Sequence, residues 1–420
     1  MSEREIPNRP ARLLRAAVPG AADGALSARE ADEYVRQAVR ETARGRDAVG
    51  GPGAVVLDTT HFDTVRFPPP QWALPLFAAA AGRGELAYTA YRGEAGVRRQ
   101  VAQAVGAFMG MRVDPEREVV LTPGTQAGLF AALSATVEEG GRVAVPDPDY
   151  LFDERIIRYL GAAVDRIGLQ LTPEGPELDL DALEESARAG ARVLLLSHPN
   201  NPTGAVHSRA TIAATGKIAE RYGMTVVADQ LYARLVYGGP LPHFAREPAL
   251  AGRCITLLGP SKTESLSGYR LGVVVAPPHL ADAIEDVLAL MALRAPAYAQ
   301  HVLVPWLRED LSWVATRVEE LRVLREMSVE WLREVDYLTV HPQAGTAYLF
   351  PDVSALRLPD QEVAARLVRD AGVLVSPGYQ FGPAGRGHFR LCYARDEQQW
   401  AAALERITTT LKALGKEQGL

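Results

Sequence analysis

The sequence predicts an α/β fold, namely a mostly parallel open sheet covered by helices, with a smaller α+β domain after it. From about residue 90 to 300, helical stretches alternate with short, continuously apolar runs rich in β-branched residues. Such runs are typical of parallel strands that are buried on both faces of a sheet. A chain of 420 residues is also too long for one small core, so a large domain and a smaller one are expected.

The expected strands of the large domain are Val119–Leu121, Val143–Val145, Val193–Leu196, Val226–Ala228, Ile255–Leu258 and Val273–Val275. In an open α/β sheet, ligands bind outside the carboxyl ends of the strands. Four candidate residues lie just past one of these runs: Gly124, Asn201, Asp229 and Lys262.

The C-terminal part mixes helical and strand-like patterns. A long amphipathic stretch at 306–335 is followed by strand-like runs at 337–340, 347–350, 373–376 and 388–393, with helices at 360–371 and 397–414. We therefore expect a large domain at 56–305 and a small domain at 306–420. Before them we expect an N-terminal arm at 1–55, with a surface helix at Ser27–Arg44.

Composition narrows the classes of partner. The net charge is −6, which does not favour nucleic acid or an anionic membrane as a partner. No apolar run approaches the ~20 residues of a membrane span, and Met1–Arg15 has no apolar signal region. The two cysteines, Cys254 and Cys392, stand in apolar runs and are expected to be buried thiols. This usage fits a reducing cytoplasm.

The most informative motif is Ser261–Arg270, which follows a predicted buried strand. A lysine at the mouth of a strand is well placed to form a Schiff base with a carbonyl cofactor, and Arg270 could pair with a phosphate. Taken alone, the same residues are more typical of a solvated loop.

Three further motifs change that balance: Thr122–Gly128, Pro199–Gly204 and Val226–Tyr232. In this order, on successive strands, the four motifs resemble the aspartate aminotransferase family. Its members are class I/II, fold-type I enzymes that use pyridoxal 5′-phosphate (PLP). The resemblance runs from about Leu57 to Leu414.

The resemblance implies roles for the residues at the cofactor's ring. Lys262 matches the Schiff-base lysine, which also shuttles the substrate Cα proton. Asp229 matches the partner of the ring nitrogen, although a strand-end Asp also caps helices. Asn201 and Tyr232 match the pair that donates to the 3′-oxygen, and Asn201 could also be an Asn-Pro turn residue. Tyr150 matches the aromatic residue stacked on the ring, with a core tyrosine as the alternative.

The phosphate is expected at the start of a helix. Gly124, Thr125 and Gln126 would present backbone N–H groups there, and Ser261 and Arg270 would complete the site.

The resemblance also implies a homodimer, because Tyr88 matches a tyrosine that reaches the phosphate from the partner subunit. Tyr91 is a rival for that role, and Tyr88 could instead be a plain core tyrosine.

The substrate is expected at Arg390, which matches the arginine that holds the α-carboxylate through two parallel hydrogen bonds. A domain-spanning salt bridge is the alternative. The sequence departs from the family at Thr60, which replaces a glycine near that carboxylate, and at Gly259, which replaces a phosphate-binding serine. Asp63 would favour a cationic substrate, or it could be a turn residue.

The leading functional hypothesis is an aminotransferase that moves the amino group of an L-amino acid to a 2-oxo acid. The Thr60 departure keeps open a PLP enzyme of the same fold with other chemistry, such as β/γ-elimination or replacement, cyclisation or oxidation. A third hypothesis is a non-enzymatic regulator or binding protein. The retained Lys262, Asp229, Asn201 and Arg390 argue against it.

Overall fold

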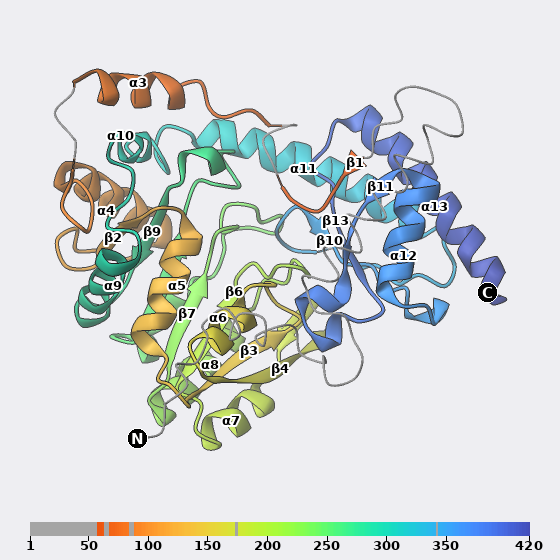
Figure 1. Cartoon of the computed structure of the whole chain (residues 1–420), viewed down its shortest axis with the longest axis horizontal. Coiled ribbons are helices and arrows are strands. Elements are labelled where there is room, and N and C mark those ends of the chain that lie inside the picture. Colours follow the sequence, from red (N-terminus) through yellow and green to blue (C-terminus); the bar gives the residue numbers. More distant parts are fainter. Residues whose placement is uncertain (1–56, 63–66, 84–87, 173–174, 342) are drawn as a thin grey trace, which may run out of the picture.

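The computed structural model describes residues 57–62, 67–83, 88–172, 175–341 and 343–420. The expected N-terminal arm at 1–55, its helix and Asp63 lie outside these residues. Figure 1 shows the large sheet at the lower left and the C-terminal elements at the right. Helix α11 (Leu311–Leu332) runs across the top from one part to the other.

The large sheet has eight strands in the order β2-β9-β8-β7-β6-β3-β4-β5. Strands β4, β3, β6, β7 and β8 are parallel, whereas β9 is antiparallel to both of its neighbours and β5 is antiparallel to β4. The bounds are β2 Val119–Thr122, β3 Arg142–Asp147, β4 Ala163–Thr172, β5 Gly175–Leu178, β6 Val193–Ser197, β7 Thr225–Asp229, β8 Cys254–Leu258 and β9 Gly272–Val275. The prediction of a mostly parallel sheet is confirmed, and all six expected runs are strands.

Helices cover both faces of this sheet, as continuous apolarity requires. In β6, Val193 and Leu195 pack in one core cluster, and Leu194 and Leu196 pack in another. The first cluster includes α5 (Thr125–Thr136), α6 (Asp153–Tyr159) and α9 (Pro278–Met291). The second includes α7 (Leu180–Arg188) and α8 (Arg209–Tyr222). A third cluster joins α4 (Ala95–Met109) to the β2 edge, near α3 (Ala73–Arg83) and α10 (Ala297–Gln300).

The C-terminal part is α+β, as expected. Strands β10 (Tyr348–Leu349), β13 (Phe389–Cys392) and β12 (Ser376–Pro377) form an antiparallel sheet in that order. Its core includes residues of α11, α12 (Asp360–Arg366) and α13 (Glu397–Gln418). The two-residue strand β1 (Leu57–Asp58) pairs in parallel with β11 (Val373–Leu374), so the first described segment packs on the C-terminal part.

Some local expectations differ from the structure. The run at 337–340 forms no strand, and Thr339 makes only an isolated bridge to Asp352. The amphipathic stretch becomes a helix only from Leu311, because Trp306 and Leu307 are buried in the α4 cluster instead. Cys254 and Cys392 are buried free thiols, as predicted. In the described part of the chain, no helix has the length and apolar character needed to cross a membrane.

Candidate active site

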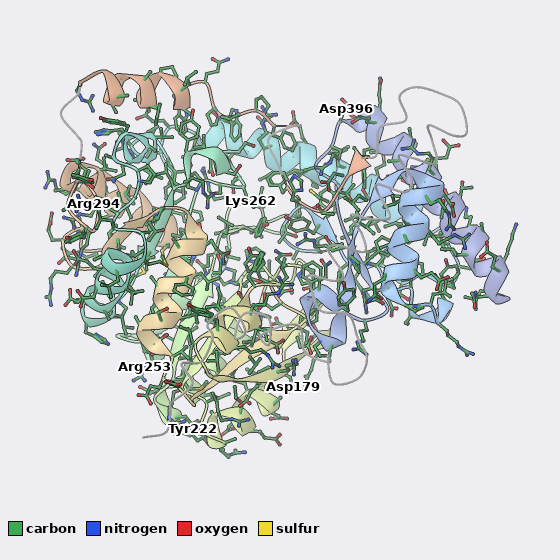
Figure 2. The ribbon with its side chains drawn as sticks, viewed as in Figure 1. Asp179, Tyr222, Arg253, Lys262, Arg294 and Asp396 are labelled. Carbon is green, nitrogen blue, oxygen red and sulfur yellow. The ribbon has the colours of Figure 1, made fainter. Side chains whose placement is uncertain are left out.

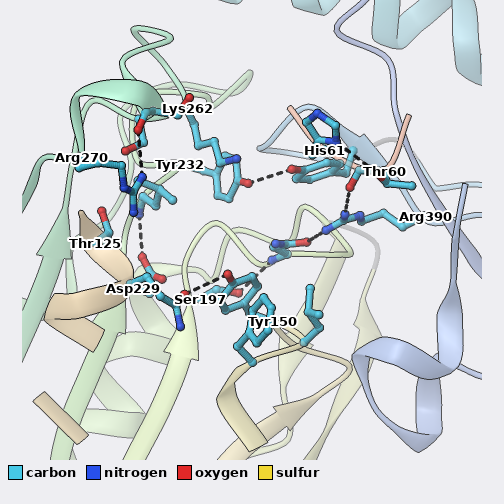
Figure 3. A pocket seen from close by; sticks show the side chains of 18 residues that line it. Thr60, His61, Thr125, Tyr150, Ser197, Asp229, Tyr232, Lys262, Arg270 and Arg390 are labelled. Carbon is cyan, nitrogen blue, oxygen red and sulfur yellow. Dashed lines mark hydrogen bonds between the residues drawn. The ribbon is translucent and has the colours of Figure 1, made fainter. Parts of the chain in front are cut away.

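A cavity of ≈ 310 Å³ lies at the carboxyl ends of the large sheet's parallel strands, facing β10 and β13. Lys262 lies near the centre of the molecule (Figure 2), and Figure 3 shows the side chains around the cavity. The predicted site residues that line it are Thr60, Thr125, Gln126, Tyr150, Asn201, Asp229, Tyr232, Ser261, Lys262, Arg270 and Arg390. The fold therefore brings together residues that are more than 300 positions apart in the sequence.

Lys262 follows β8, and its loop is anchored by a hydrogen bond of its own and by a buried ion pair. Its Nζ donates to the Phe62 carbonyl oxygen at 3.2 Å. Two residues on, the buried Glu264 forms an ion pair with Arg234, which also binds Asp310 at 2.8 Å. Burial raises the pKa of Glu264 to about 7, while the Arg234 charge opposes that rise. This network joins the lysine loop, the loop after β7 and the start of α11.

Asp229 ends β7 and faces the cavity. Burial raises its pKa to about 6, and the N–H of Leu231, which donates at 3.0 Å, opposes the rise. Among the described residues, no lysine or arginine forms an ion pair with Asp229. A carboxylate beside a cavity without a cationic partner suits a positively charged ring nitrogen. The local bond to Leu231 shows that Asp229 also orders its own turn.

An anion-binding cradle lies where α5 begins. The N–H groups of Thr125 and Gln126 have no acceptor within the helix, as in any first helical turn. Ser261, Ser267 and Arg270 also line the cavity, and Arg270 donates to the Ser267 carbonyl oxygen at 2.9 Å. Gly124 does not line it but has φ +87°, and a Cβ there would overlap the Arg270 guanidinium. These donors fit the phosphate of PLP.

Gly259, the second departure from the family, has a steric reason. A Cβ at this position would lie 2.7 Å from the Thr125 hydroxyl oxygen. The hydroxyl of Thr125 therefore occupies the space into which a residue 259 side chain would project.

Tyr232 and Tyr150 lie on different sides of the cavity (Figure 3). The Tyr232 hydroxyl lies 3.0 Å from that of Tyr348, and both rings are buried. Burial raises the pKa of Tyr232, so its hydroxyl stays protonated at neutral pH. Tyr150 donates to Gln126 Oε1 at 3.0 Å.

Arg390 is 4% exposed and enters the cavity from β13. Its guanidinium donates to Asn201 Oδ1 at 2.7 Å and to the Thr60 carbonyl oxygen. It lies over the rings of Tyr348 and Phe381, 4.1 and 4.6 Å from their centroids. Its Nε is buried without an acceptor, and no described carboxylate pairs with it. The alternative of a domain-spanning salt bridge is therefore wrong, and Arg390 retains capacity for an anionic ligand.

The segment 58–62, which contains Thr60, contacts the site through its main chain. Its five consecutive carbonyl oxygens accept hydrogen bonds, in order, from Arg395, the Cys392 N–H, Arg390, Arg395 and Lys262. The Thr60 hydroxyl instead donates to Asp58 Oδ1 at 2.7 Å. The Thr60 side chain is thus tied down locally while its carbonyl oxygen holds Arg390.

Tyr88, like Gly124, does not line the cavity. Its ring is 72% exposed, and the Arg294 guanidinium lies 4.6 Å from its centroid. Tyr91 packs on the same guanidinium at 4.8 Å. Figure 2 places Arg294 at the periphery of the molecule, away from Lys262.

The lining residues that were not predicted include three with hydroxyl groups: Ser197, Ser267 and Tyr348. Ser267 lies inside the Lys262 motif, and Ser197 directly follows a predicted strand, so position alone could have suggested both. Tyr348 lies in a predicted small-domain strand, but nothing in its pattern indicates which neighbour it faces.

Comparisons with known proteins agree with this geometry. The family model for aminotransferases of class I and II matches residues 58–407. The crystal structure of an aspartate aminotransferase from Rhodobacter sphaeroides is 37% identical, with a TM-score of 0.83 over 88% of this chain and 96% of that one. The aspartate/prephenate aminotransferase of Thermus thermophilus is 28% identical over 85% of this chain and 90% of its own length. Aromatic-amino-acid aminotransferase 2 of Thermococcus litoralis is 28% identical, over 79% and 86%.

The match covers both the large sheet and the C-terminal strands, and it includes every described residue placed around the cavity. The chain therefore belongs to the class I and II aminotransferases, a family of pyridoxal 5′-phosphate-dependent transferases.

Proposed function

We propose that the protein moves the amino group of an L-amino acid to a 2-oxo acid, with the cavity residues in the following roles. The observation that carries the proposal is Arg390, a buried arginine with an unpartnered Nε that faces Lys262 and Asp229 across one cavity. The names of the relatives support transamination over elimination, cyclisation or oxidation.

Arg390 would bind the substrate α-carboxylate. Arginine and carboxylate pair through parallel hydrogen bonds, which fix orientation as well as affinity. The contacts to Asn201 and to the Thr60 carbonyl oxygen hold the guanidinium in place before substrate arrives. The substrate Cα is then constrained near Lys262.

Lys262 would hold the aldehyde carbon of PLP and, once substrate displaces it, would carry the proton of the substrate Cα. Bound PLP supplies a protonated pyridine ring that accepts the electron pair left at the substrate Cα. Asp229 would pair with that ring nitrogen and keep its proton in place. Tyr232 and Asn201 would donate hydrogen bonds to the 3′-oxygen.

The cradle at α5 would hold the phosphate. Thr125 and Gln126 contribute backbone N–H groups, Ser261 and Ser267 contribute hydroxyls, and Arg270 contributes its charge. Tyr150 would stack on the ring.

We also propose that the protein works as a homodimer in the cytoplasm, and that Tyr88 or Tyr91 reaches the partner's phosphate site. The support is a surface of exposed aromatic and apolar side chains. Tyr88 is 72% exposed, and Leu290, near the end of α9, is 91% exposed. Sedimentation tests the assembly, and an active monomer at assay concentration contradicts it.

The reaction itself is tested by a screen of amino acids with mass-spectrometric detection, with and without a 2-oxo acid acceptor. Transamination yields one new amino acid for each donor consumed, and only when acceptor is present. Release of ammonia without acceptor contradicts the proposal and indicates elimination or oxidation. Lys262→Ala is the control, because it should abolish either product.

A further inference from the structure

The proposed roles leave a buried carboxylate, Asp149, unexplained. It lies between β3 and the cavity wall and is 2% exposed. Two donors of Ser197 reach it: the backbone N–H at 3.1 Å from Oδ2, and the hydroxyl, which donates to Oδ1. The N–H of Tyr150 also donates to Oδ1, at 2.7 Å.

Ser197 connects Asp149 to Asn201 and, through Asn201, to Arg390. Its hydroxyl oxygen accepts the Asn201 N–H at 2.9 Å. Asn201 Oδ1 in turn accepts from Arg390 at 2.7 Å. A hydroxyl has one proton to donate, so giving it to Asp149 directs the remaining lone pairs toward Asn201.

The backbone of Asp149 makes a second connection to the same arginine. Its N–H donates to the Phe381 carbonyl oxygen at 3.0 Å. The Phe381 ring lies under the Arg390 guanidinium, at 4.6 Å. Asp149 is therefore linked to two of the contacts of Arg390, to Asn201 through Ser197 and to the Phe381 ring through the Phe381 backbone.

We infer that Asp149 is a positioning residue, which acts through Ser197 and Asn201 to orient Arg390 for the substrate carboxylate. The inference rests on the proposed role of Arg390. An asparagine at 149 cannot replace the aspartate, because three donors converge on its two carboxylate oxygens. Whichever way the amide is turned, its NH₂ group would face a donor of Ser197, either the backbone N–H or the hydroxyl. Ser197 would therefore shift, and its contact with the Asn201 N–H would weaken.

Asp153 provides a matched control. It is similarly buried, at 3% exposed, and its carboxylate hydrogen-bonds none of the described residues. It also lies close enough to Asp149 and Asp229 for their charges to raise its pKa, after burial, which is the larger cause. Asp153→Asn thus makes the same side-chain exchange in the same neighbourhood without breaking the path to Arg390.

The test measures two quantities in the holoenzyme. The first is KM against kcat for the best amino acid found in the screen. The second is the Kd of 3-phenylpropionate, a carboxylic acid without an amino group, by calorimetry. We expect Asp149→Asn to raise both KM and Kd by about tenfold or more, with kcat changed by less than about threefold. Asp153→Asn should change KM and Kd by less than about twofold.

Ser197→Ala tests the same path if Asp149→Asn does not fold. It should also raise the Kd of 3-phenylpropionate about tenfold. The variant that combines Asp149→Asn with Ser197→Ala should have a Kd no higher than that of the more affected single variant, because both changes break one path.

Equal effects of the two Asp→Asn changes, multiplicative effects in the double variant, or an unchanged Kd in Ser197→Ala would each overturn the inference. If the wild type itself binds no carboxylate, the role of Arg390 fails, and this inference fails with it. Intact wild-type binding with no effect of the variants overturns the inference alone.

Discussion

Asp229→Asn should separate the charge of Asp229 from its structural role, because asparagine still offers an oxygen to the Leu231 N–H. The pKa of Asp229 rises from 3.8 to about 6 on folding because the carboxylate loses solvation. At about 1.36 kcal/mol for each unit, this burial costs about 3 kcal/mol of folding free energy at neutral pH. That figure is an upper value, because water in the cavity screens the charge.

The direction in which pH changes the stability follows from the number of protons bound by the folded and unfolded states. Between pH 3.8 and about 6 the folded state of the protein without cofactor holds a proton that the unfolded state has lost. Stability therefore falls as pH rises through this window. Asp229→Asn should unfold at higher denaturant concentration than wild type at pH 8, and the difference should nearly vanish at pH 4. Its amino-transfer activity should fall by about a hundredfold or more, because the ring nitrogen loses its partner.

Chemical denaturation of both cofactor-free proteins at the two pH values checks the stability claim. An equal difference at both pH values, or a variant less stable than wild type at pH 8, would refute the reasoning. Activity within a few-fold of wild type would mean that Asp229 only orders its turn.

Further predictions concern single contacts. Borohydride treatment of the holoenzyme should attach the cofactor to Lys262, as peptide mapping would show, and Lys262→Ala should lower turnover by about a thousandfold or more; a label on another lysine contradicts the assignment. Arg390→Lys should raise KM about a hundredfold for every amino acid alike, because the parallel hydrogen bonds are lost. Steady-state kinetics on several amino-acid donors measures this. A rise in KM for only some donors argues that Arg390 does not bind the α-carboxylate. Tyr348→Phe leaves the Tyr232 hydroxyl without its 3.0 Å partner and should cost about 1 kcal/mol of stability, seen as a lower melting temperature; an unchanged melting temperature argues that the pair contributes nothing.

The sequence predicted the large sheet well because its strands are buried on both faces. Val193–Leu196 has to be apolar throughout, so the run and the polar residue after it are both visible. β4 was not predicted, since Asp165 and Arg166 interrupt the apolar pattern of a strand near the sheet edge. The pairing of β1 with β11 was not predicted either, because two-residue strands leave no periodic signal.

The cavity residues also divide into those that the sequence predicts and those that it does not. Lys262 and Asp229 follow strands of the large sheet, so topology alone brings them to one edge. The contacts of Tyr348 and Asp149 depend on how the C-terminal strands face that edge, which is set by packing between segments more than 100 residues apart. Local pattern carries no information about such contacts, so the path from Asp149 to Arg390 becomes visible only in three dimensions.

The run of five carbonyl oxygens at 58–62 has a consequence for how substrate preference can diverge in evolution. Arg390, Arg395 and Lys262 are held there by peptide oxygens, which every amino acid possesses. The side chains of Thr60 and His61 also line the cavity, yet the anchoring does not depend on their identity. Substitutions at these two positions can therefore change the shape of the cavity while the backbone contacts of Arg390, the proposed α-carboxylate ligand, stay the same.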